Sequence, residues 1–170
     1  MNRKQVNAFL KIRSKDKTRP VLCSAYVDEL NGKMVLVATD GYVLTAVYLG
    51  EEARDYLGKR VTREAVERWY KLADGKSRLT GETLQELMED DQYNSRDLDG
   101  TYPGWKRLMP TETDTSGFMQ DMTISFNTDY VKRVQDLNGS EGVKMRLYGK
   151  LAPMVIESEV SLSVVMPMKG

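Results

Sequence analysis

The sequence contains no histidine and only one cysteine among 170 residues. Without histidine the chain lacks the base of Ser-His-Asp and Cys-His catalytic sites and the imidazole ligands common in zinc sites. The single cysteine, Cys23, rules out a disulfide within this sequence, and its place in the apolar run "PVLCSAY" predicts a small buried residue. We therefore expect no metal site, no cofactor and no enzymatic activity.

Long hydrophobic runs are absent as well. No apolar stretch approaches the roughly 20 residues that a membrane-spanning helix needs. The N-terminal stretch "MNRKQVNAFLKIRSKDK" lacks the continuous apolar segment of a signal peptide. We therefore expect a cytoplasmic protein that does not enter a membrane.

Net charge is also absent, because 25 basic side chains balance 25 acidic ones, but the charges are unevenly distributed. Residues 1–19 hold seven basic groups and one acid, a charge of +6, and the rest of the chain holds 18 basic and 24 acidic groups, a charge of −6. This asymmetry predicts one surface for a polyanion and another that avoids it. The acidic side chains assigned to the second surface are Glu86, Glu89, Asp90 and Asp91.

A helix-like segment followed by strand-like segments occurs three times. In the first unit, apolar spacing predicts a helix over residues 3–13. The β-branched and aromatic content predicts strands over 19–30, 33–40 and 42–49. Asn31-Gly32 and Asp40-Gly41 are typical hairpin turns between these strands.

The second unit begins at Thr62, a good helix N-cap, and the third is the clearest of the three. After the second helix we predict strands near 77–80, 83–88 and 93–98. The stretch "ETLQELMED" favours a helix by propensity, but the repeat favours a strand there, which we adopt. The third unit predicts a strand in "MTISF", a helix in "NTDYVKRVQDL", and strands in "VKMRL", "PMVIES" and "VSLSVVMPM". Residues 111–117 are the predicted linker, dividing domain 1–110 from domain 118–170.

Three motifs in this order, "LVATDGYVL", "GTYPGWKRLMP" and the final "SVVMPMK", resemble the bacterial DNA polymerase III beta subunit family, the sliding clamps. The resemblance implies an α+β, DNA-clamp-like fold of repeated helix-plus-antiparallel-strand units, with sheets outside and helices on one face. Residues 1–110 resemble the middle clamp domain, which has two half-domain repeats. Residues 118–170 resemble only the C-terminal half of the last domain, so the chain is similar to a shortened clamp.

Clamps of this family surround duplex DNA with their helices inside and read no sequence. Independently of the resemblance, lysines spaced along the first helix suit electrostatic contact with phosphates. The candidate DNA-binding residues are Arg3, Lys4, Lys11, Lys15, Lys132 and Arg133. The alternative interpretation of the first helix is a solvated amphipathic face without a ligand.

The resemblance also implies a hydrophobic pocket that binds short linear motifs, typically containing glutamine, leucine and phenylalanine. Its three walls are the Thr-Asp-Gly hairpin, the proline motif before the linker, and the C-terminal strand. The matching residues are Thr39, Gly41, Tyr42, Val43, Leu44, Pro103, Leu108, Val164, Met166, Pro167, Met168 and Lys169. The family usually has histidine and arginine after the glycine, where this chain has Tyr42 and Val43. Taken singly, the three walls are also explained as a plain turn, a tight connection and an edge strand blunted by Pro167.

The resemblance thus predicts a sliding clamp-like processivity factor. Its expected partners are duplex DNA, a DNA polymerase or other proteins with clamp-binding motifs, and further copies of itself. A lone third unit would expose an unpaired face and sheet edge, so we expect a homo-oligomer, either a dimer or a tetrameric ring of twelve units. The alternative is a clamp-derived peptide-binding module that forms no ring and competes for clamp-binding partners.

Overall fold

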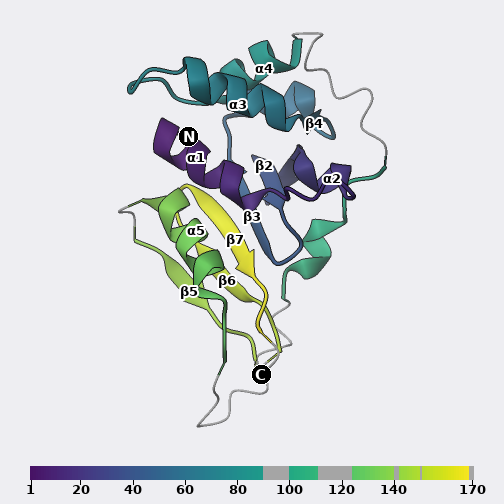
Figure 1. The fold of residues 1–170 in the computed structure, drawn as a ribbon, viewed down its shortest axis with the longest axis vertical. Helices are drawn as coiled ribbons and strands as arrows, with labels where there is room; N and C mark the ends of the chain where they lie inside the picture. Colours follow the sequence, from purple (N-terminus) through teal and green to yellow (C-terminus); the bar gives the residue numbers. More distant parts are fainter. Residues whose placement is uncertain (90–99, 111–123, 140–141, 150, 169–170) are drawn as a thin grey trace.

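The computed structural model describes residues 1–89, 100–110, 124–139, 142–149 and 151–168. Seven strands form one antiparallel sheet in the order β4-β1-β2-β3-β7-β6-β5 (Figure 1). The strands are β1 (Ala25–Leu30), β2 (Lys33–Thr39), β3 (Val43–Tyr48), β4 (Arg60–Val61), β5 (Lys144–Arg146), β6 (Met154–Glu157) and β7 (Ser161–Val165). The pairing of β3 with β7 places Leu44 opposite Val164, so the sheet runs continuously through both predicted domains.

The helices begin at sequence signals of the usual kind. They are α1 (Arg3–Ile12), α2 (Pro20–Cys23), α3 (Arg63–Leu72), α4 (Gly81–Glu89) and α5 (Thr128–Asn138), with 3-10 turns η1 (Glu51–Tyr56) and η4 (Trp105–Leu108). A reciprocal capping box between Asn2 and Gln5 starts α1, because each side chain accepts the other residue's backbone N–H. α3 and α5 begin with one-way caps, in which the hydroxyl of Thr62 accepts the N–H of Ala65 and the side chain of Asn127 accepts the N–H of Asp129.

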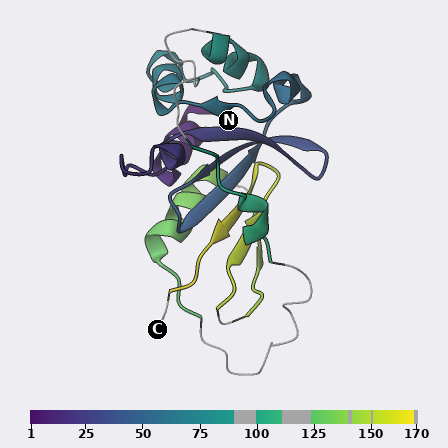
Figure 2. The same ribbon diagram turned by 90° about the vertical axis from the view of Figure 1, so that its right-hand side faces the viewer.

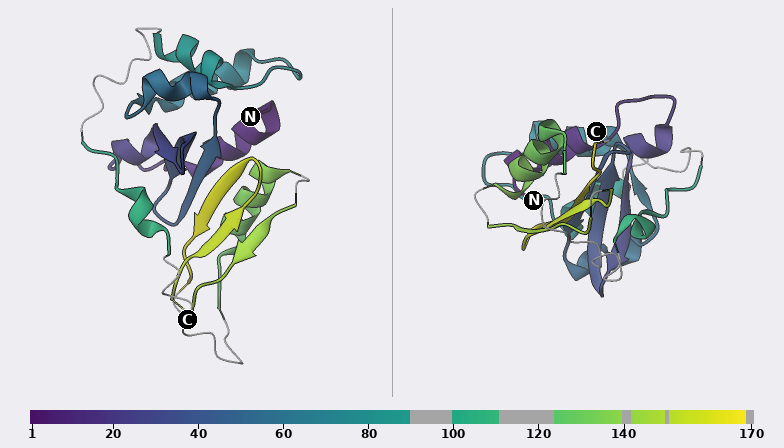
Figure 3. Two further views of the ribbon diagram at one scale, coloured as in Figure 1. Left: turned by 180° about the vertical axis from the view of Figure 1, so that it is seen from behind. Right: turned by 90° about the horizontal axis from the view of Figure 1, so that it is seen from below.

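Two apolar clusters lie on opposite faces of the sheet. The inner cluster joins α1, α3, α4 and α5 to the sheet, with Phe9 and Leu137 fully buried. The outer cluster lies under Tyr102 and Trp105, which cover Leu44 and Val164. Figure 2 and the right-hand view of Figure 3 show α5 and η4 on opposite sides of the strands. Alternating side chains along β3 therefore pack into the inner and the outer cluster in turn.

This architecture confirms the predicted clamp-like α+β fold, with the main helices on one face of an antiparallel sheet. Both predicted hairpin turns are present, and Asn31, Gly32 and Gly41 have the positive φ that such turns require. The predicted strand over 19–30 was wrong at its start, where α2 precedes β1. Pro20 occupies the first turn of α2, a position where its missing N–H costs nothing.

The second unit departs most from the repeat. Residues 81–89 form α4, so the strand predicted over 83–88 was wrong and the helix propensity of this stretch prevailed. Near 77–80 the backbone makes only a single bridge, between Arg78 and Asn2, and 93–98 lie outside the described residues. β4 ends at Val61, before the second unit begins, so within the described residues this unit contributes no strand to the sheet. The expected ring of twelve equivalent units assumed a set of strands in every unit.

The third unit follows its prediction closely. The strands in "VKMRL", "PMVIES" and "VSLSVVMPM" correspond to β5, β6 and β7, and the predicted helix to α5. Of "MTISF", the described residues form one bridge, between Phe126 and Pro167. One expected free edge is already occupied, because β7 pairs with β3 of the same chain and β5 forms the outer edge.

Candidate peptide and nucleic-acid interfaces

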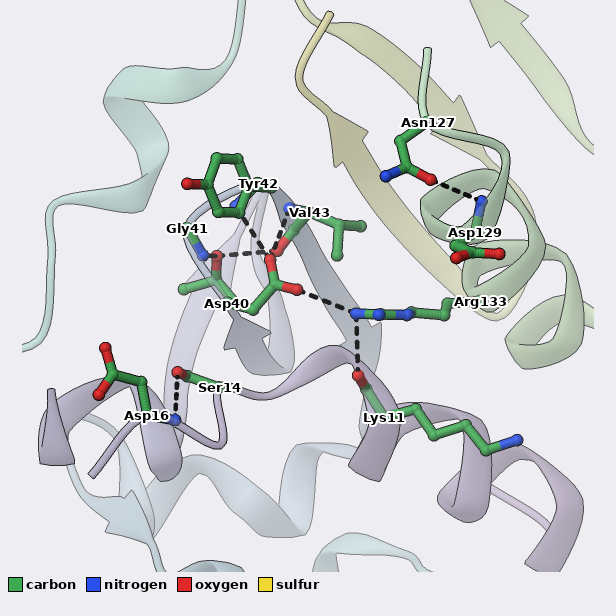
Figure 4. Close-up of polar contacts among 11 residues, drawn as sticks. Lys11, Ser14, Asp16, Asp40, Gly41, Tyr42, Val43, Asn127, Asp129 and Arg133 are labelled. Carbon is green, nitrogen blue, oxygen red and sulfur yellow. Dashed lines mark hydrogen bonds and ion pairs between the residues drawn. The ribbon is translucent and has the colours of Figure 1, made fainter. Parts of the chain in front are cut away.

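The turn between β2 and β3 is stabilised by its own side chains (Figure 4). The hydroxyl of Thr39 donates to the carbonyl of Val43 at 2.8 Å and accepts the N–H of Gly41 at 3.0 Å. One carboxylate oxygen of Asp40 accepts the N–H groups of Tyr42 and Val43 at 2.9 and 3.0 Å. Gly41 has φ near +97°, a conformation that glycine adopts without steric cost. The sequence Thr-Asp-Gly thus builds a rigid hairpin tip.

This tip is also joined to two helices. The second carboxylate oxygen of Asp40 accepts a bond from Nη1 of Arg133 on α5 at 2.9 Å, and the same Nη1 donates to the carbonyl of Lys11 on α1 at 3.3 Å (Figure 4). Tyr42 stacks on Tyr130 with their ring centroids 5.9 Å apart. Burial raises the pKa of Tyr130, and the nearby Asp40 carboxylate raises it further, so its phenol stays neutral. The hairpin therefore has a fixed orientation relative to the helices.

The C-terminal strand lies directly beside this hairpin. Beyond β7, the N–H of Met166 donates to the carbonyl of Tyr42 at 3.0 Å. The N–H of Met168 donates to the carbonyl of Ser125 at 2.8 Å, and Pro167 bridges to Phe126. The described part of the Met-Pro-Met tail is thus held between the hairpin and the segment that precedes α5.

The 102–109 segment forms the third side of the junction. Tyr102 stacks on Tyr26 with ring centroids 4.8 Å apart. The indole N–H of Trp105 donates to Asp28 at 2.8 Å, and Lys106 forms an ion pair with the other oxygen of the same carboxylate at 2.9 Å. Burial raises the pKa of Tyr102 well above its ordinary value, so its hydroxyl remains a donor. These contacts hold the proline motif against the outer face of the sheet.

The three predicted walls of the peptide pocket therefore meet around one junction, which we call the hairpin junction, although their side chains play different parts. Leu44 and Val164 are buried in the outer cluster, whereas Val43 belongs to the inner cluster. Thr39 is buried as well, Met166 and Pro167 are half-buried, and Gly41 and Pro103 are exposed. Three large apolar side chains reach solvent, namely Tyr42 at 60%, Leu108 at 42% and Met168 at 51% exposure. Lys169 lies outside the described residues.

A second feature is a groove of about 800 Å³ along the exposed face of α1, which we call the basic groove. Arg3, Lys4 and Lys11 line it from α1, and Arg78 lines it from the loop after α3. The guanidinium of Arg3 lies over the ring of Tyr70, 4.9 Å from its centroid. Sequence reasoning found the α1 residues but missed Arg78, whose position depends on the bridge to Asn2.

The other predicted DNA-binding residues do not line this groove. Lys15 follows the end of α1 and lines a different cavity. Lys132 is 71% exposed and lies 3.6 Å from Asp136, an acid that itself lines the basic groove. Arg133 is joined to Asp40, as described above. The structure thus places Arg3, Lys4 and Lys11 along one groove. Arg133 contacts the carbonyl of Lys11, and Lys132 pairs with an acid of the groove, but neither lines it.

The predicted acidic surface is described only in part. Glu86 and Glu89 are exposed on α4, and Asp90 and Asp91 lie outside the described residues. Among the residues that the structure describes, no group of three or more acidic or cysteine side chains is placed to hold a metal ion. No helix in the described ranges is long and apolar enough to span a membrane.

No family model matches the sequence, and no curated protein matches it. Solved structures of bacterial sliding clamps do match its fold. The clamp of Bacillus subtilis gives a TM-score of 0.66 at 13% identity, covering 99% of this chain and 62% of that chain. The Caulobacter crescentus polymerase III beta protein gives 0.65 at 15%, covering 99% and 63%. The Bartonella birtlesii clamp, solved bound to griselimycin, gives 0.61 at 16%, covering 99% and 63%. The chain has the fold of bacterial sliding clamps and spans less than two thirds of their length.

Proposed function

We propose that this chain is a sliding clamp-like processivity factor without catalytic activity, which works in the cytoplasm on duplex DNA. It associates with DNA without reading sequence, and it binds short linear motifs of DNA polymerases or repair proteins. In this proposal residues 1–110 form a clamp-type domain and residues 118–170 half of a second one. The hairpin junction carries the proposal, because the three segments that the resemblance assigns to one pocket meet there.

The peptide is proposed to bind over the exposed apolar side chains of the junction. Tyr42, Leu108 and Met168 are the exposed apolar side chains of these three segments, and Met166 and Pro167 are half-buried. Methionine adapts its flexible thioether to varied ligands. Burying one leucine and one phenylalanine of a peptide contributes about 1.5 to 3 kcal/mol each, which suits a weak, exchangeable contact. Because Tyr42 and Val43 replace a histidine and an arginine, we expect apolar contacts to dominate.

Fluorescence anisotropy with a labelled peptide that contains glutamine, leucine and phenylalanine tests this site. Leu108→Ala combined with Met168→Ala removes two exposed side chains, so we expect an unchanged fold and at least about tenfold weaker binding. Leu72→Ala is the matched control, because Leu72 is 74% exposed on α3. Equal affinity of the double variant and the wild type would exclude the junction as the peptide site.

DNA is proposed to contact the basic groove. Phosphate contacts release counterions, so affinity for a 20-base-pair duplex should fall steeply with salt. Lys4→Ala with Lys11→Ala should reduce the slope of log affinity against log salt by about 1.8, at about 0.9 per phosphate contact. Lys33→Ala with Lys59→Ala is the control, because those ammonium groups lie over the rings of Tyr48 and Tyr56, which do not line the groove. An unchanged slope in the α1 variant would place DNA on another face.

Self-association is proposed to involve the edge at β5. An apolar groove of about 470 Å³ lies between α5 and β5, lined by Val131, Val134, Val143, Met145 and Ile156 among others. Met145 is 54% exposed on the edge strand. An exposed apolar groove beside a free strand edge is unfavourable in a monomer. A second copy covering this groove would give a dimer, and we propose that dimers associate further around DNA.

The alternative function, a peptide-binding module without a ring, is favoured by the second unit, which supplies no strand to the sheet within the described residues. Native mass by light scattering, at several concentrations and two salt concentrations, separates the two functions. A tetramer or another closed assembly supports the clamp. A monomer, or a dimer that goes no further, supports the module. Met145→Glu should lower the mass of any assembly built on the β5 edge.

A further inference from the structure

A separate cavity of about 440 Å³ lies at the C-terminal end of α1. It is bounded by residues 14–17, by α2 and by the start of α3, and it shares no lining residue with the basic groove. Its charged lining residues are Lys15, Lys17, Arg63 and Glu64. Neither the peptide proposal nor the α1 groove uses this cavity.

Arg13 is buried next to the cavity-lining Ser14 and forms no ion pair with any acid that the structure describes, although the charges of Glu67 and Glu64 act on it. Arg13 is 1% exposed, and its Nε and Nη1 atoms have no hydrogen-bond partner in the part of the chain that the structure describes. Its Nη2 donates only a long bond, 3.4 Å, to the carbonyl of Arg63. Nη1 of Arg63 is likewise buried without a partner, while Nε of Arg63 pairs with Glu67. Burial, followed by the charge of Arg63, lowers the pKa of Arg13 to about 10.

The charges around this point do not cancel. Arg13, Arg63, Lys15, Lys17 and Arg19 supply five positive charges, and Asp16, Glu64 and Glu67 supply three negative ones, of which Asp16 pairs with Arg19. A buried ion is costly unless it is paired, and the cost is relieved by a counterion. The first turn of α3 adds to the positive potential, because its leading N–H groups have no partner within the helix and only that of Ala65 is capped by Thr62.

We propose that this cavity, which we call the anion cavity, binds a phosphate group. Lys15, Lys17 and the N–H groups at the start of α3 contact the phosphate. Arg13 does not touch it, but its buried positive charge attracts the phosphate electrostatically. Glu64 opposes binding. The phosphate belongs either to free inorganic phosphate or to a DNA backbone. Binding of a DNA backbone phosphate rests on the proposed function, whereas binding of free inorganic phosphate does not.

Thermal unfolding of the full chain in sodium phosphate, against sodium chloride of equal ionic strength, tests the site. A ligand of the folded state raises the melting temperature with its concentration, so phosphate should raise it and chloride should not. Lys15→Ala with Lys17→Ala should weaken phosphate about tenfold, and Glu64→Gln should strengthen it severalfold by removing the opposing charge. Lys33→Ala with Lys59→Ala is the matched control, because neither lysine lines either cavity, and it should leave phosphate binding unchanged.

The Arg13→Met variant tests whether the charge of Arg13 supports phosphate binding or whether Arg13 is only a buried side chain of the fold. The thioether chain keeps the packing on Phe9, so the variant should fold, lose the phosphate effect and melt no lower than the wild type without phosphate. If this variant fails to fold, the lysine and Glu64→Gln variants decide. Equal melting temperatures in phosphate and chloride, or no strengthening in Glu64→Gln, would overturn the proposal.

A competition experiment identifies the source of the phosphate. If inorganic phosphate displaces a 20-base-pair duplex at the concentration that half-saturates the thermal shift, the natural ligand is a DNA backbone. If phosphate binds without displacing the duplex, the ligand is free phosphate, and both results support the cavity. A chain that binds phosphate but no DNA would refute the proposed function and leave the anion cavity standing.

Discussion

The ion pair between Asp40 and Arg133 should contribute measurably to the stability of the fold. Its atoms are 2.9 Å apart, and the two side chains are only 15% and 32% exposed. Exposed pairs contribute about 0.2 to 1 kcal/mol, and breaking a fully buried pair costs about 3 to 5 kcal/mol. For a half-buried pair we therefore expect a coupling free energy of about 1 to 2 kcal/mol. Asp40→Asn keeps an oxygen for the hairpin N–H groups, so it removes mainly the charge.

Urea unfolding of Asp40→Asn, Arg133→Met and the double variant measures this coupling as a double-mutant cycle. Lys132→Met is the control, since its exposed pairing with Asp136 should contribute at most about 0.5 kcal/mol. A coupling within about 0.3 to 0.5 kcal/mol of zero, the range for independent sites, would refute the reasoning. The Arg133→Met protein also tests whether Arg133 contacts DNA. If its guanidinium only stabilises the hairpin through Asp40, the affinity for a DNA duplex should be nearly unchanged.

Three further predictions concern stability. Trp105→Phe removes the indole N–H that a half-buried aspartate of β1 accepts, so we expect a loss of about 1.5 to 3 kcal/mol in urea unfolding. Thr45→Val leaves the hydroxyl of Ser163 buried without its 2.9 Å partner and should cost about 1 to 3 kcal/mol, whereas adding Ser163→Ala should recover much of that loss. Hydrogen bonds from Ser77 and the adjacent backbone lower the pKa of Asp74 below 3.8, so its contribution is present above that pH and disappears as the pH falls through the lowered pKa. Asp74→Asn should therefore flatten the acid limb of the unfolding profile, and an unchanged limb would contradict the assignment.

The elements with strong local signals were predictable from the sequence. Asn31-Gly32 and Asp40-Gly41 require positive φ, and only a few residue types allow it, so both turns follow from the residues themselves. The helices at 3–12 and 128–138 combine an N-cap with an apolar stripe. Each of these signals lies within a few residues of sequence, which is why no tertiary information was needed.

Residues 81–89 show why the second unit was mispredicted. The repeat argued for a strand, but the stretch contains good helix formers, and Thr80 and Thr83 cap its start with reciprocal side-chain bonds. The resulting α4 buries Leu84 in the inner cluster. A sequence repeat predicts the secondary structure of a segment only where the apolar core positions of the repeat are kept. Here the helix propensity and the N-terminal cap decided the structure, and the expected strand did not form.

For the candidate site, the sequence predicted which segments lie close together but not which side chains are exposed. The motifs identified three stretches that meet, yet exposure depends on strand register, which directs Val43 to the inner cluster and Leu44 to the outer one. The partner of Arg133 was hidden for a similar reason, because Asp40 lies 93 positions away. Arg13 is one of the seven basic groups counted in residues 1–19, and only the packing around it shows that it is buried.

The pairing of β3 with β7 indicates that the proposed peptide binding and the proposed encirclement of DNA differ in whether they need several copies of the chain. This pairing joins the first and third units into one sheet, and the hairpin junction lies at its end. A single folded chain therefore brings the described residues of the proposed peptide site into one sheet, whether or not copies close around DNA. Peptide affinity should then be independent of protein concentration, whereas retention on closed circular DNA should rise steeply with it. Peptide affinity that rises in step with assembly would mean that a second copy completes the pocket, and the β5 edge would then be the surface to examine.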